Sequence, residues 1–172
     1  GIYCSYSSPT IANNTITANS AVGGWFDARG GGIYCLGGFP TIASNTITAN
    51  IVIAETGDLG CGGGICCSAC NATIVNNVIA GNTASSYGGG IYCEGAATTL
   101  IANNTITGNN SPYGGGGICP WSYTAITIAN TIVAANSSGM FIGGPGTLTL
   151  RSNCVFGNSG FESVEAALKT AM

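Results

Sequence analysis

The chain has 172 residues, which is enough for one domain with a sizeable core, and its formal net charge is −3. Charged residues make up 5% of the chain and apolar residues 45%, a balance that argues against intrinsic disorder. Only three residues are basic, which argues against a nucleic-acid partner, and Asn or Gly interrupts every apolar run before it could span a membrane.

A motif of about twenty residues recurs six times along the chain, and its last copy is degraded. It joins a glycine run and Ile-Tyr-Cys to Thr-Ile-Ala-Asn-Asn-Thr-Ile-Thr-Ala-Asn, with the fullest copy at residues 30–50. One asparagine marks the same place in each copy, and its positions are separated by 31, 32, 27, 26 and 23 residues. These residues are Asn14, Asn45, Asn77, Asn104, Asn130 and Asn153. A period of this length indicates a solenoid, because propeller blades need about 40 residues each.

Each copy contains three short strand-like pieces, Gly-Ile-Tyr-Cys, Thr-Ile-Ala and Thr-Ile-Thr. In each piece one Ile lies between residues that can face outward, as the two-residue period of a strand requires. Three strands per coil, stacked about 4.8 Å apart, make a parallel β-helix, and parallel crossovers are overwhelmingly right-handed. We therefore predict an all-β, right-handed parallel β-helix of about six coils over residues 1–160.

The asparagines are predicted to hold the corners of the coils. Asn tolerates left-handed backbone geometry, and its amide carries both a donor and an acceptor. Stacked in register, each amide can bond the amides above and below it. We predict two internal ladders, one formed by Asn14, Asn45, Asn77, Asn104, Asn130 and Asn153 and the other by Asn19, Asn50, Asn82, Asn109, Asn136 and Asn158.

Length variation between copies is confined to one corner of the coil. From the second ladder to the next Gly-Ile the gaps are 14, 15, 9, 9 and 5 residues, so one edge carries loops that shorten along the chain. Residues 161–172 are predicted to form a short capping helix or tail, because a capping-box pattern precedes apolar residues on one helical face. Gly1 already lies inside a repeat, which suggests a mature product or a piece of a longer chain.

The copies resemble the right-handed parallel β-helix repeat proteins of bacterial surfaces and secretions. The Gly-Gly-Gly-Ile and Ile-x-x-Asn elements, such as residues 16–19 and 106–109, are also similar to the Gly-Gly-Ala-Ile and Phe-x-x-Asn motifs of polymorphic outer-membrane proteins. This resemblance covers residues 1–158. It implies the solenoid fold but no single activity, since the same fold serves lyases, glycosidases, adhesins and inert stalks.

The nine cysteines and the absence of His favour an oxidising compartment. Four cysteines share one inward repeat position, and neighbours there would be near enough for a disulfide, although buried free thiols are an equal alternative. Cys66 and Cys67 should face opposite sides of a strand, which argues against a metal site. The disulfide candidates are Cys4, Cys35, Cys61, Cys66, Cys67, Cys70 and Cys93, and Cys154 is a candidate free thiol. We expect neither a metal nor a cofactor.

Charged side chains near loops give a weak enzymatic alternative. A β-helix lyase or glycoside hydrolase needs acids on one face, and the candidates are Asp27, Arg29, Glu55 and Asp58. The first two and the last two lie in successive long insertions, so the two pairs could approach each other. Solvated loop charges explain the same residues more simply, and we therefore lean towards a protein without enzymatic activity.

Two outward surfaces are candidates for binding. Thr-x-Thr pairs resemble the ice-binding face of β-solenoid antifreeze proteins, although the third copy replaces them and threonine is also a good exposed strand residue. Aromatic residues suit sugar rings, although stacked tyrosines can equally form a plain cross-strand ladder. The binding candidates are Thr15, Thr17, Thr46, Thr48, Thr105, Thr107, Tyr3, Tyr34, Tyr92 and Trp25.

The sequence thus predicts an extracellular or cell-surface solenoid with a structural or adhesive role. Carbohydrate bound along a face or the long-loop edge is the first expected partner. A second copy is the other, since the first coil shows no cap and its strand edge could accept another molecule and build a filament. Ice binding and polysaccharide cleavage are the alternatives.

Overall fold

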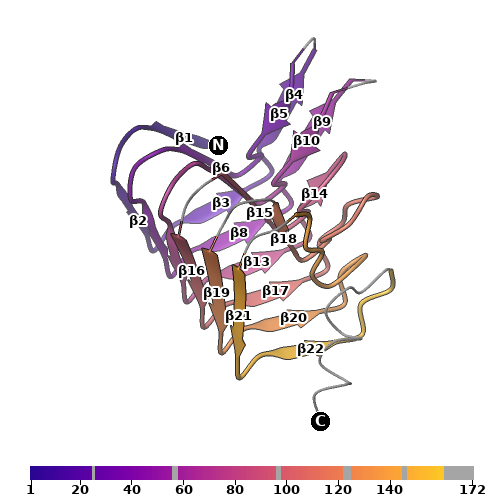
Figure 1. The fold of residues 1–172 in the computed structure, drawn as a ribbon. Coiled ribbons are helices and arrows are strands. Elements are labelled where there is room, and N and C mark those ends of the chain that lie inside the picture. The colour runs from indigo at the N-terminus through magenta and orange to yellow at the C-terminus, as the bar shows by residue number, and fades with distance from the viewer. Residues whose placement is uncertain (25, 56–57, 96–97, 122–124, 145–146, 161–172) are drawn as a thin grey trace.

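The computed structural model describes residues 1–24, 26–55, 58–95, 98–121, 125–144 and 147–160. These residues form 22 strands and no helix, and each strand pairs in parallel with the equivalent strand of the next coil. The coils stack one on another along a single axis (Figure 1). The predicted all-β parallel β-helix is confirmed. The predicted helix of residues 161–172 lies outside the described residues.

Three sheets form the sides of the solenoid. Sheet A, built from the pieces that begin with the Ile of Gly-Ile, contains β1 (Ile2–Ser5), β6 (Ile33–Leu36), β11 (Ile65–Ser68), β15 (Ile91–Glu94) and β18 (Ile118–Trp121). Sheet B contains β2 (Thr10–Ala12), β7 (Thr41–Ala43), β12 (Thr73–Val75), β16 (Thr98–Ala102), β19 (Ala125–Ala129) and β21 (Thr147–Arg151). Sheet C contains β3 (Thr15–Thr17), β8 (Thr46–Thr48), β13 (Val78–Ala80), β17 (Thr105–Thr107), β20 (Ile132–Ala134) and β22 (Cys154–Phe156).

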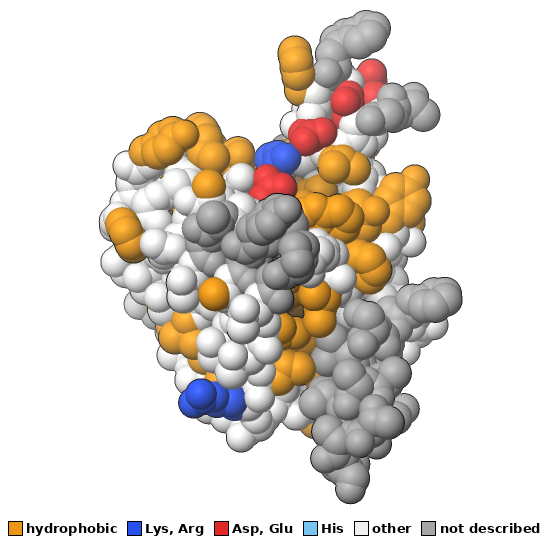
Figure 2. All heavy atoms as spheres, in the orientation of Figure 1, with side chains coloured by type: hydrophobic (Ala, Val, Ile, Leu, Met, Phe, Trp, Pro, Cys, Tyr) orange, Lys and Arg blue, Asp and Glu red, His pale blue; other side chains and the backbone are white. Residues whose placement is uncertain are grey.

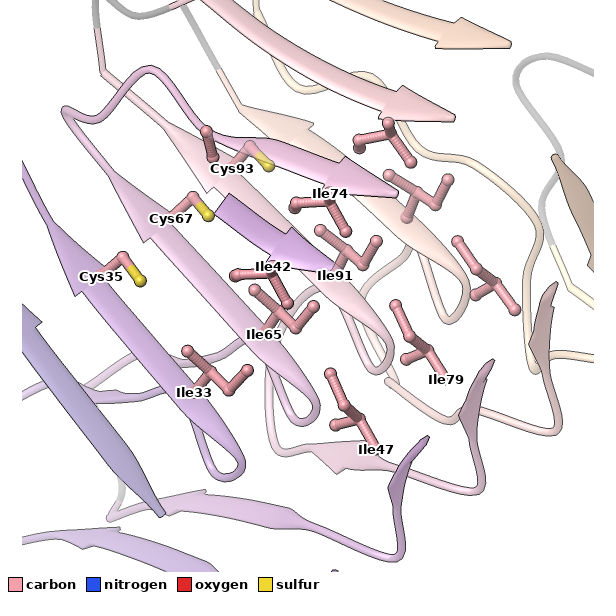
Figure 3. Packing of buried hydrophobic residues seen from close by; sticks show 14 of the residues in the cluster. Ile33, Cys35, Ile42, Ile47, Ile65, Cys67, Ile74, Ile79, Ile91 and Cys93 are labelled. Carbon is pink, nitrogen blue, oxygen red and sulfur yellow. The ribbon is translucent and has the colours of Figure 1, made fainter. Parts of the chain in front are cut away.

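The core is a stack of isoleucine rows with a row of thiols. Most strands of the three sheets turn an Ile inward, with Val or Leu in the last coils, and in the central coils side chains such as Ile42, Ile47 and Ile65 are fully buried. Cys35, Cys67 and Cys93 point into the same interior beside them (Figure 3). Each fully buried Ile contributes roughly 1.5–3 kcal/mol from the area removed from water, so the rows dominate the stability of the fold.

The asparagines form two hydrogen-bonded columns at the corners on either side of sheet C. In the second column the Nδ2 group of Asn50 donates to Oδ1 of Asn82 at 2.9 Å and to the carbonyl of Ile16 at 2.9 Å. The backbone N–H of Asn50 donates to the same Oδ1 at 3.0 Å. Each buried amide is therefore satisfied by the coil before it and the coil after it. This column contains all six residues that the sequence predicts, Asn19, Asn50, Asn82, Asn109, Asn136 and Asn158.

The first column differs from the prediction at one member. It contains Asn14, Asn45, Asn77, Asn104 and Asn153, but Thr131 and not Asn130 stands between the last two. The Thr131 hydroxyl accepts the N–H of Asn104 at 3.3 Å and donates to the carbonyl of Ala129 at 3.0 Å. Asn130 instead has a φ of 48°. The column residue is the third residue after the buried Ile of sheet B, as Asn104 is after Ile101. In the fifth coil the third residue after Ile128 is Thr131.

The long insertions form additional strands that the three-strand unit does not predict. After sheet C the chain continues into β4 (Ser20–Gly23), β9 (Ile51–Ala54) and β14 (Thr83–Ala84), and it returns through β5 (Ala28–Arg29) and β10 (Gly60–Cys61). β4 pairs with β9, and β5 pairs with β10. β4 and β5 form one arm and β9 and β10 form the other, and the two arms project side by side beyond the coils (Figure 1). We refer to residues 20–29 and 51–61 as the arms.

Each arm returns closely over the outer face of sheet A, and a glycine makes this approach possible. Gly30 has a φ of +63°, and a Cβ at this position would lie 2.5 Å from the Cβ of Tyr34. Gly62 meets Cys66 in the same way at 2.6 Å in the next coil. Any other residue would combine a steric clash with an unfavourable left-handed backbone, so these glycines place the base of the arms on sheet A.

Candidate functional site

Charged and aromatic side chains gather on one side of the solenoid. On the outer faces of sheets B and C the described side chains are Thr, Ala, Val, Leu, Ile and Cys, apart from Phe156 and Arg151. The remaining described charges lie on the arms or at the end of β15. Figure 2 shows these charges on the arms and at their base, where they lie beside a group of apolar side chains. The outer face of sheet A with the arms is therefore the chemically distinct side.

A cluster of ionic side chains anchors the first arm to sheet A. Arg29 Nη2 lies 2.9 Å from Asp27 Oδ2, and Arg29 Nη1 forms an ion pair with Glu94. Burial lowers the pKa of Arg29, but Glu94, Cys66, Asp27 and Tyr34 together outweigh burial, so the pKa lies above its ordinary value. Arg29 therefore remains positively charged at neutral pH.

Neighbouring groups occupy both carboxylates of this cluster. Glu94 Oε1 accepts the Ser68 hydroxyl at 2.9 Å, and Glu94 Oε2 accepts the Tyr92 hydroxyl at 3.2 Å. Asp27 Oδ1 accepts the backbone N–H of Leu59 in the second arm at 3.0 Å. The cluster thus connects both arms to two strands of sheet A.

The other two acidic candidates lie apart from this cluster. Within the described part of the chain, neither the Glu55 nor the Asp58 side chain makes a hydrogen bond or an ion pair. The two long insertions do approach each other, since β4 pairs with β9 and β5 with β10. The second carboxylate beside Arg29, however, is Glu94 on β15 and neither Glu55 nor Asp58. Sequence spacing could not show this contact, since it joins residues 65 positions apart.

The outward tyrosine row of sheet A is only partly as predicted. Tyr3 and Tyr34 stack with their ring centroids 5.2 Å apart and an interplanar angle of 27°. Cys66 stands opposite Tyr34 in the next strand, so Tyr92 is separated from this pair. Tyr92 is also buried, which makes it part of the packing under the arms rather than a binding surface. Trp25 lies outside the described residues.

Two further rings extend the Tyr3–Tyr34 pair to the adjoining corner. Tyr6, directly after β1, is 80% exposed, and its ring lies against the backbone of Gly37. Phe39, in the next coil, is 65% exposed and donates its N–H to the Ser8 hydroxyl at 3.2 Å. Tyr3 itself is 62% exposed. We call Tyr3, Tyr6, Tyr34 and Phe39 the aromatic surface. Tyr3 and Tyr34 lie within two successive Ile-Tyr-Cys motifs, and Tyr6 and Phe39 follow those motifs closely. This shared position is the sequence signal that could have predicted the aromatic surface.

The threonine rows of sheet C are interrupted. Thr15 and Thr46 are in register, but Val78, Ile132 and Cys154 occupy the same row in other coils. The second row begins with Thr17 and Thr48, whose hydroxyls are 3.1 Å apart, and includes Thr107, but it also contains Ala80, Ala134 and Phe156. The described face is not a continuous threonine array.

The cysteines occupy both faces of sheet A as free thiols. Cys4, Cys35, Cys67 and Cys93 are in register on the inner face, whereas Cys66 lies on the outer face against Cys61, Tyr92 and Cys119. None of the nine is in a disulfide. Burial raises the pKa of Cys35 to about 12 and that of Cys61 to about 11, so these thiols are protonated and weakly nucleophilic at neutral pH. Cys154 is exposed, as its outward position predicts.

A second group of aromatic rings lies further along the solenoid. Tyr87 contacts Trp121 at 4.9 Å and Tyr113 at 5.7 Å between ring centroids, and Phe141 completes the group. Tyr113 and Phe141 line a cavity of about 440 Å³ together with three serines. Ser111, Ser137 and Ser138 use their hydroxyls in bonds to neighbouring backbone groups. This group was not predicted, because Trp121 ends strand β18 while Tyr87, Tyr113 and Phe141 come from segments between strands.

Other expected features concern the ends and the surroundings of the chain. The first coil presents a hollow of about 320 Å³ lined by Asn14, Ile16 and Asn19 among others, and end-to-end assembly at this edge stays a prediction. No helix among the described residues is long and apolar enough to cross a membrane. In the same part of the chain, no group of three or more Cys, Asp or Glu side chains is placed to hold a metal ion.

Comparison with known families agrees with the geometry of the coils. The family described as the right handed beta helix region matches residues 1–168, so the chain belongs to this family and its solenoid is right-handed. The comparisons with curated proteins and with solved structures gave no match. Membership establishes the scaffold and leaves the activity to be inferred from the side chains on it.

Proposed function

We propose that this chain is a glycan-binding β-solenoid, and that the aromatic surface is its binding site. The observation that carries the proposal is the stacked pair of Tyr3 and Tyr34, with the exposed rings of Tyr6 and Phe39 in the same two coils. The ion-paired cluster around Arg29 lies on the same side of the molecule. Sugar rings have apolar faces that suit aromatic side chains, and their hydroxyls suit carboxylate, guanidinium and phenol groups. Three of the four rings are more than half exposed, so they are available to a ligand.

The scaffold supports binding to a polymer rather than to a small molecule. Equivalent residues of successive strands repeat at about 4.8 Å, and the aromatic surface is part of an open side of the molecule. A long chain can therefore lie across several rings at once, and each added contact increases the residence time. Polysaccharides are abundant outside cells and on their surfaces, so we propose an extracellular or cell-surface location with an adhesive role.

Affinity electrophoresis in gels that contain soluble polysaccharides tests the proposal. We expect retention by at least one polymer and about five- to tenfold weaker binding after Tyr3→Ala, given the energy of one aromatic contact together with its buried area. Phe156→Ala is the matched control, because Phe156 is a 54% exposed ring on the outer face of sheet C. Equal weakening by both substitutions, or retention by no polymer, contradicts the proposed site. Fractionation of the producing cells tests the location.

A further inference from the structure

The cation nearest to the aromatic surface is already paired with two protein carboxylates. Burial and the neighbouring Cys66 raise the pKa of Tyr34, whereas the positive charge of Arg29 lowers it. The two terminal nitrogens of Arg29 are taken up by Asp27 and Glu94. Those carboxylates are held in turn by Ser68, Tyr92 and Leu59. An anionic ligand would have to displace these bonds before it reached the guanidinium.

The surrounding charges are negative. In the described part of the chain, Asp27, Glu94, Glu55 and Asp58 lie on the arms or sheet A, against the single positive charge of Arg29. Arg151 is exposed on β21 of sheet B, at the last coils of the solenoid. Breaking the Arg29 cluster would leave a half-buried carboxylate without its partner, which is a costly exchange. The side that carries the aromatic surface therefore disfavours anions.

We infer that the ligand of the aromatic surface is an uncharged, hydroxyl-rich polysaccharide, and that the Asp27–Arg29–Glu94 cluster excludes polyuronates by keeping Arg29 occupied. This inference rests on the proposed glycan-binding function and names its ligand class. Neutral sugars lose no charge solvation on binding and offer donors as well as acceptors to Tyr hydroxyls and carboxylates. A polyuronate presents a carboxylate on every sugar, and each one meets net negative charge here.

The probes are a soluble cellulose derivative, glucomannan and xyloglucan as neutral polymers, and polygalacturonate and alginate as acidic ones. We expect the neutral polymers to bind at least about tenfold more tightly at low salt, with less than about a twofold change between 50 and 500 mM NaCl, since screening acts only on charges. Salt-sensitive retention by polygalacturonate overturns the inference while it supports glycan binding. Retention by no polymer overturns the proposed function and the inference with it.

Releasing Arg29 provides a gain-of-function test. Glu94→Gln and Asp27→Asn keep the shapes of the side chains but remove the charges that hold the guanidinium. We expect each to increase binding of polygalacturonate by about fivefold or more at low salt, because a freed guanidinium pairs with carboxylates in a bidentate manner. Asp27 is exposed, so Asp27→Asn keeps the test available if Glu94→Gln fails to fold.

The matched control is Glu55→Gln, which removes the same charge from the arms without touching Arg29. We expect it to leave the binding of polygalacturonate unchanged within about twofold, because Glu55 makes no ion pair in the described part of the chain and its removal frees no guanidinium. An equal gain from Glu55→Gln would show that overall charge, not the occupation of Arg29, decides selectivity, and it would overturn the inference. The absence of any gain from well-folded Asp27→Asn and Glu94→Gln variants would also overturn it.

Discussion

The corner columns of sheet C and the arms on sheet A are held together in different ways. In the columns the same bonds recur in every coil, with Asn50, Asn82 and Asn109 each bonded to the equivalent group of the next coil. At the arms a single arginine joins residues that occupy different repeat positions. The comparison teaches that repetition builds the scaffold, whereas the distinctive surface arises where the repeat is interrupted.

Alkaline pH is expected to give the largest effect, because it acts on buried thiols both in the regular core and at the arms. Burial raises the pKa of Cys35 to about 12 and that of Cys61 to about 11, against about 9 when unfolded. The unfolded chain loses these protons first, so the stabilisation is complete below pH 9 and is lost as pH rises to 11 or 12. Unfolding in urea at stepped pH measures this loss.

Variants divide that alkaline loss between the two regions. Cys35→Ala removes a buried thiol of the core, and Cys61→Ala removes one at the arms. Each should make the decline in the free energy of unfolding above pH 9 shallower. Cys154→Ala should leave the slope unchanged, because Cys154 is exposed in both states. A stability that stays level up to pH 12 in the unmodified protein would contradict the burial of these thiols.

Removing a core side chain should be the most damaging substitution in the regular region. Ile79→Ala empties a fully buried position of sheet C, and we expect a loss of about 2–5 kcal/mol in the free energy of unfolding. The adjacent Val78→Ala acts on the outer face and should change it by less than about 0.5 kcal/mol. Chemical denaturation followed by circular dichroism measures both, and similar losses would mean that the register is displaced by one residue.

Interrupting a column is expected to cost less. Asn82→Ala leaves the partners above and below it unpaired inside the protein, so we expect a loss of about 1–3 kcal/mol. Asn110→Ala is the control, because the Asn110 side chain is exposed and makes no hydrogen bond among the described residues. If both variants melt at the temperature of the parent protein, the columns do not support the fold.

Removing the arginine tests the irregular region. Arg29→Met deprives Glu94 and Asp27 of their partner, and because both remain partly exposed we expect a loss of about 1–2 kcal/mol. Arg151→Met, at an exposed position, should change the free energy of unfolding by less than about 0.5 kcal/mol. Hydrogen exchange should locate the destabilisation in residues 20–29. Uniform exchange along the whole chain would contradict a local anchoring role.

The smallest expected effect concerns the one irregular member of the first column. Thr131→Asn supplies the amide that the other coils have, and we expect a gain of about 0.5–1 kcal/mol from one added hydrogen bond. Asn130→Ser should be nearly neutral, because Ser44 and Ser152 adopt the same left-handed conformation. A large loss in the free energy of unfolding from Asn130→Ser would indicate that Asn130 is itself a column residue, which would contradict the observed register.

The sequence was sufficient for the scaffold because each coil repeats its neighbour. The spacing of Ile42, Asn45 and Ile47 recurs in most copies, and a local rule then places every strand and nearly every column residue. It failed at Asn130, where residue identity and spacing from the buried Ile disagreed. In a solenoid the spacing prevails, because a one-residue shift would turn the following strand inside out.

The candidate site was less accessible to prediction because it depends on contacts between non-equivalent positions. Tyr3 and Tyr34 were foreseen as a pair, since they share a repeat position in adjacent coils. The burial of Tyr92 and the pairing of Arg29 with Glu94 were not, because both follow from how the arms return over sheet A. The return of the arm over sheet A depends on Gly30, because a Cβ there would clash with Tyr34. This requirement can be recognised only from the folded structure.

The columns also give the solenoid an electrical direction. In the second column every side-chain amide donates towards the next coil, from Asn19 through to Asn158, so the amide dipoles point the same way and add together. The side-chain oxygens (Oδ1) face the first coil, where Asn19 Oδ1 accepts a hydrogen bond from the amino group of Gly1 at 2.6 Å. The first coil is therefore the end of the column at which a positive group is favoured, and the last coil favours a negative one.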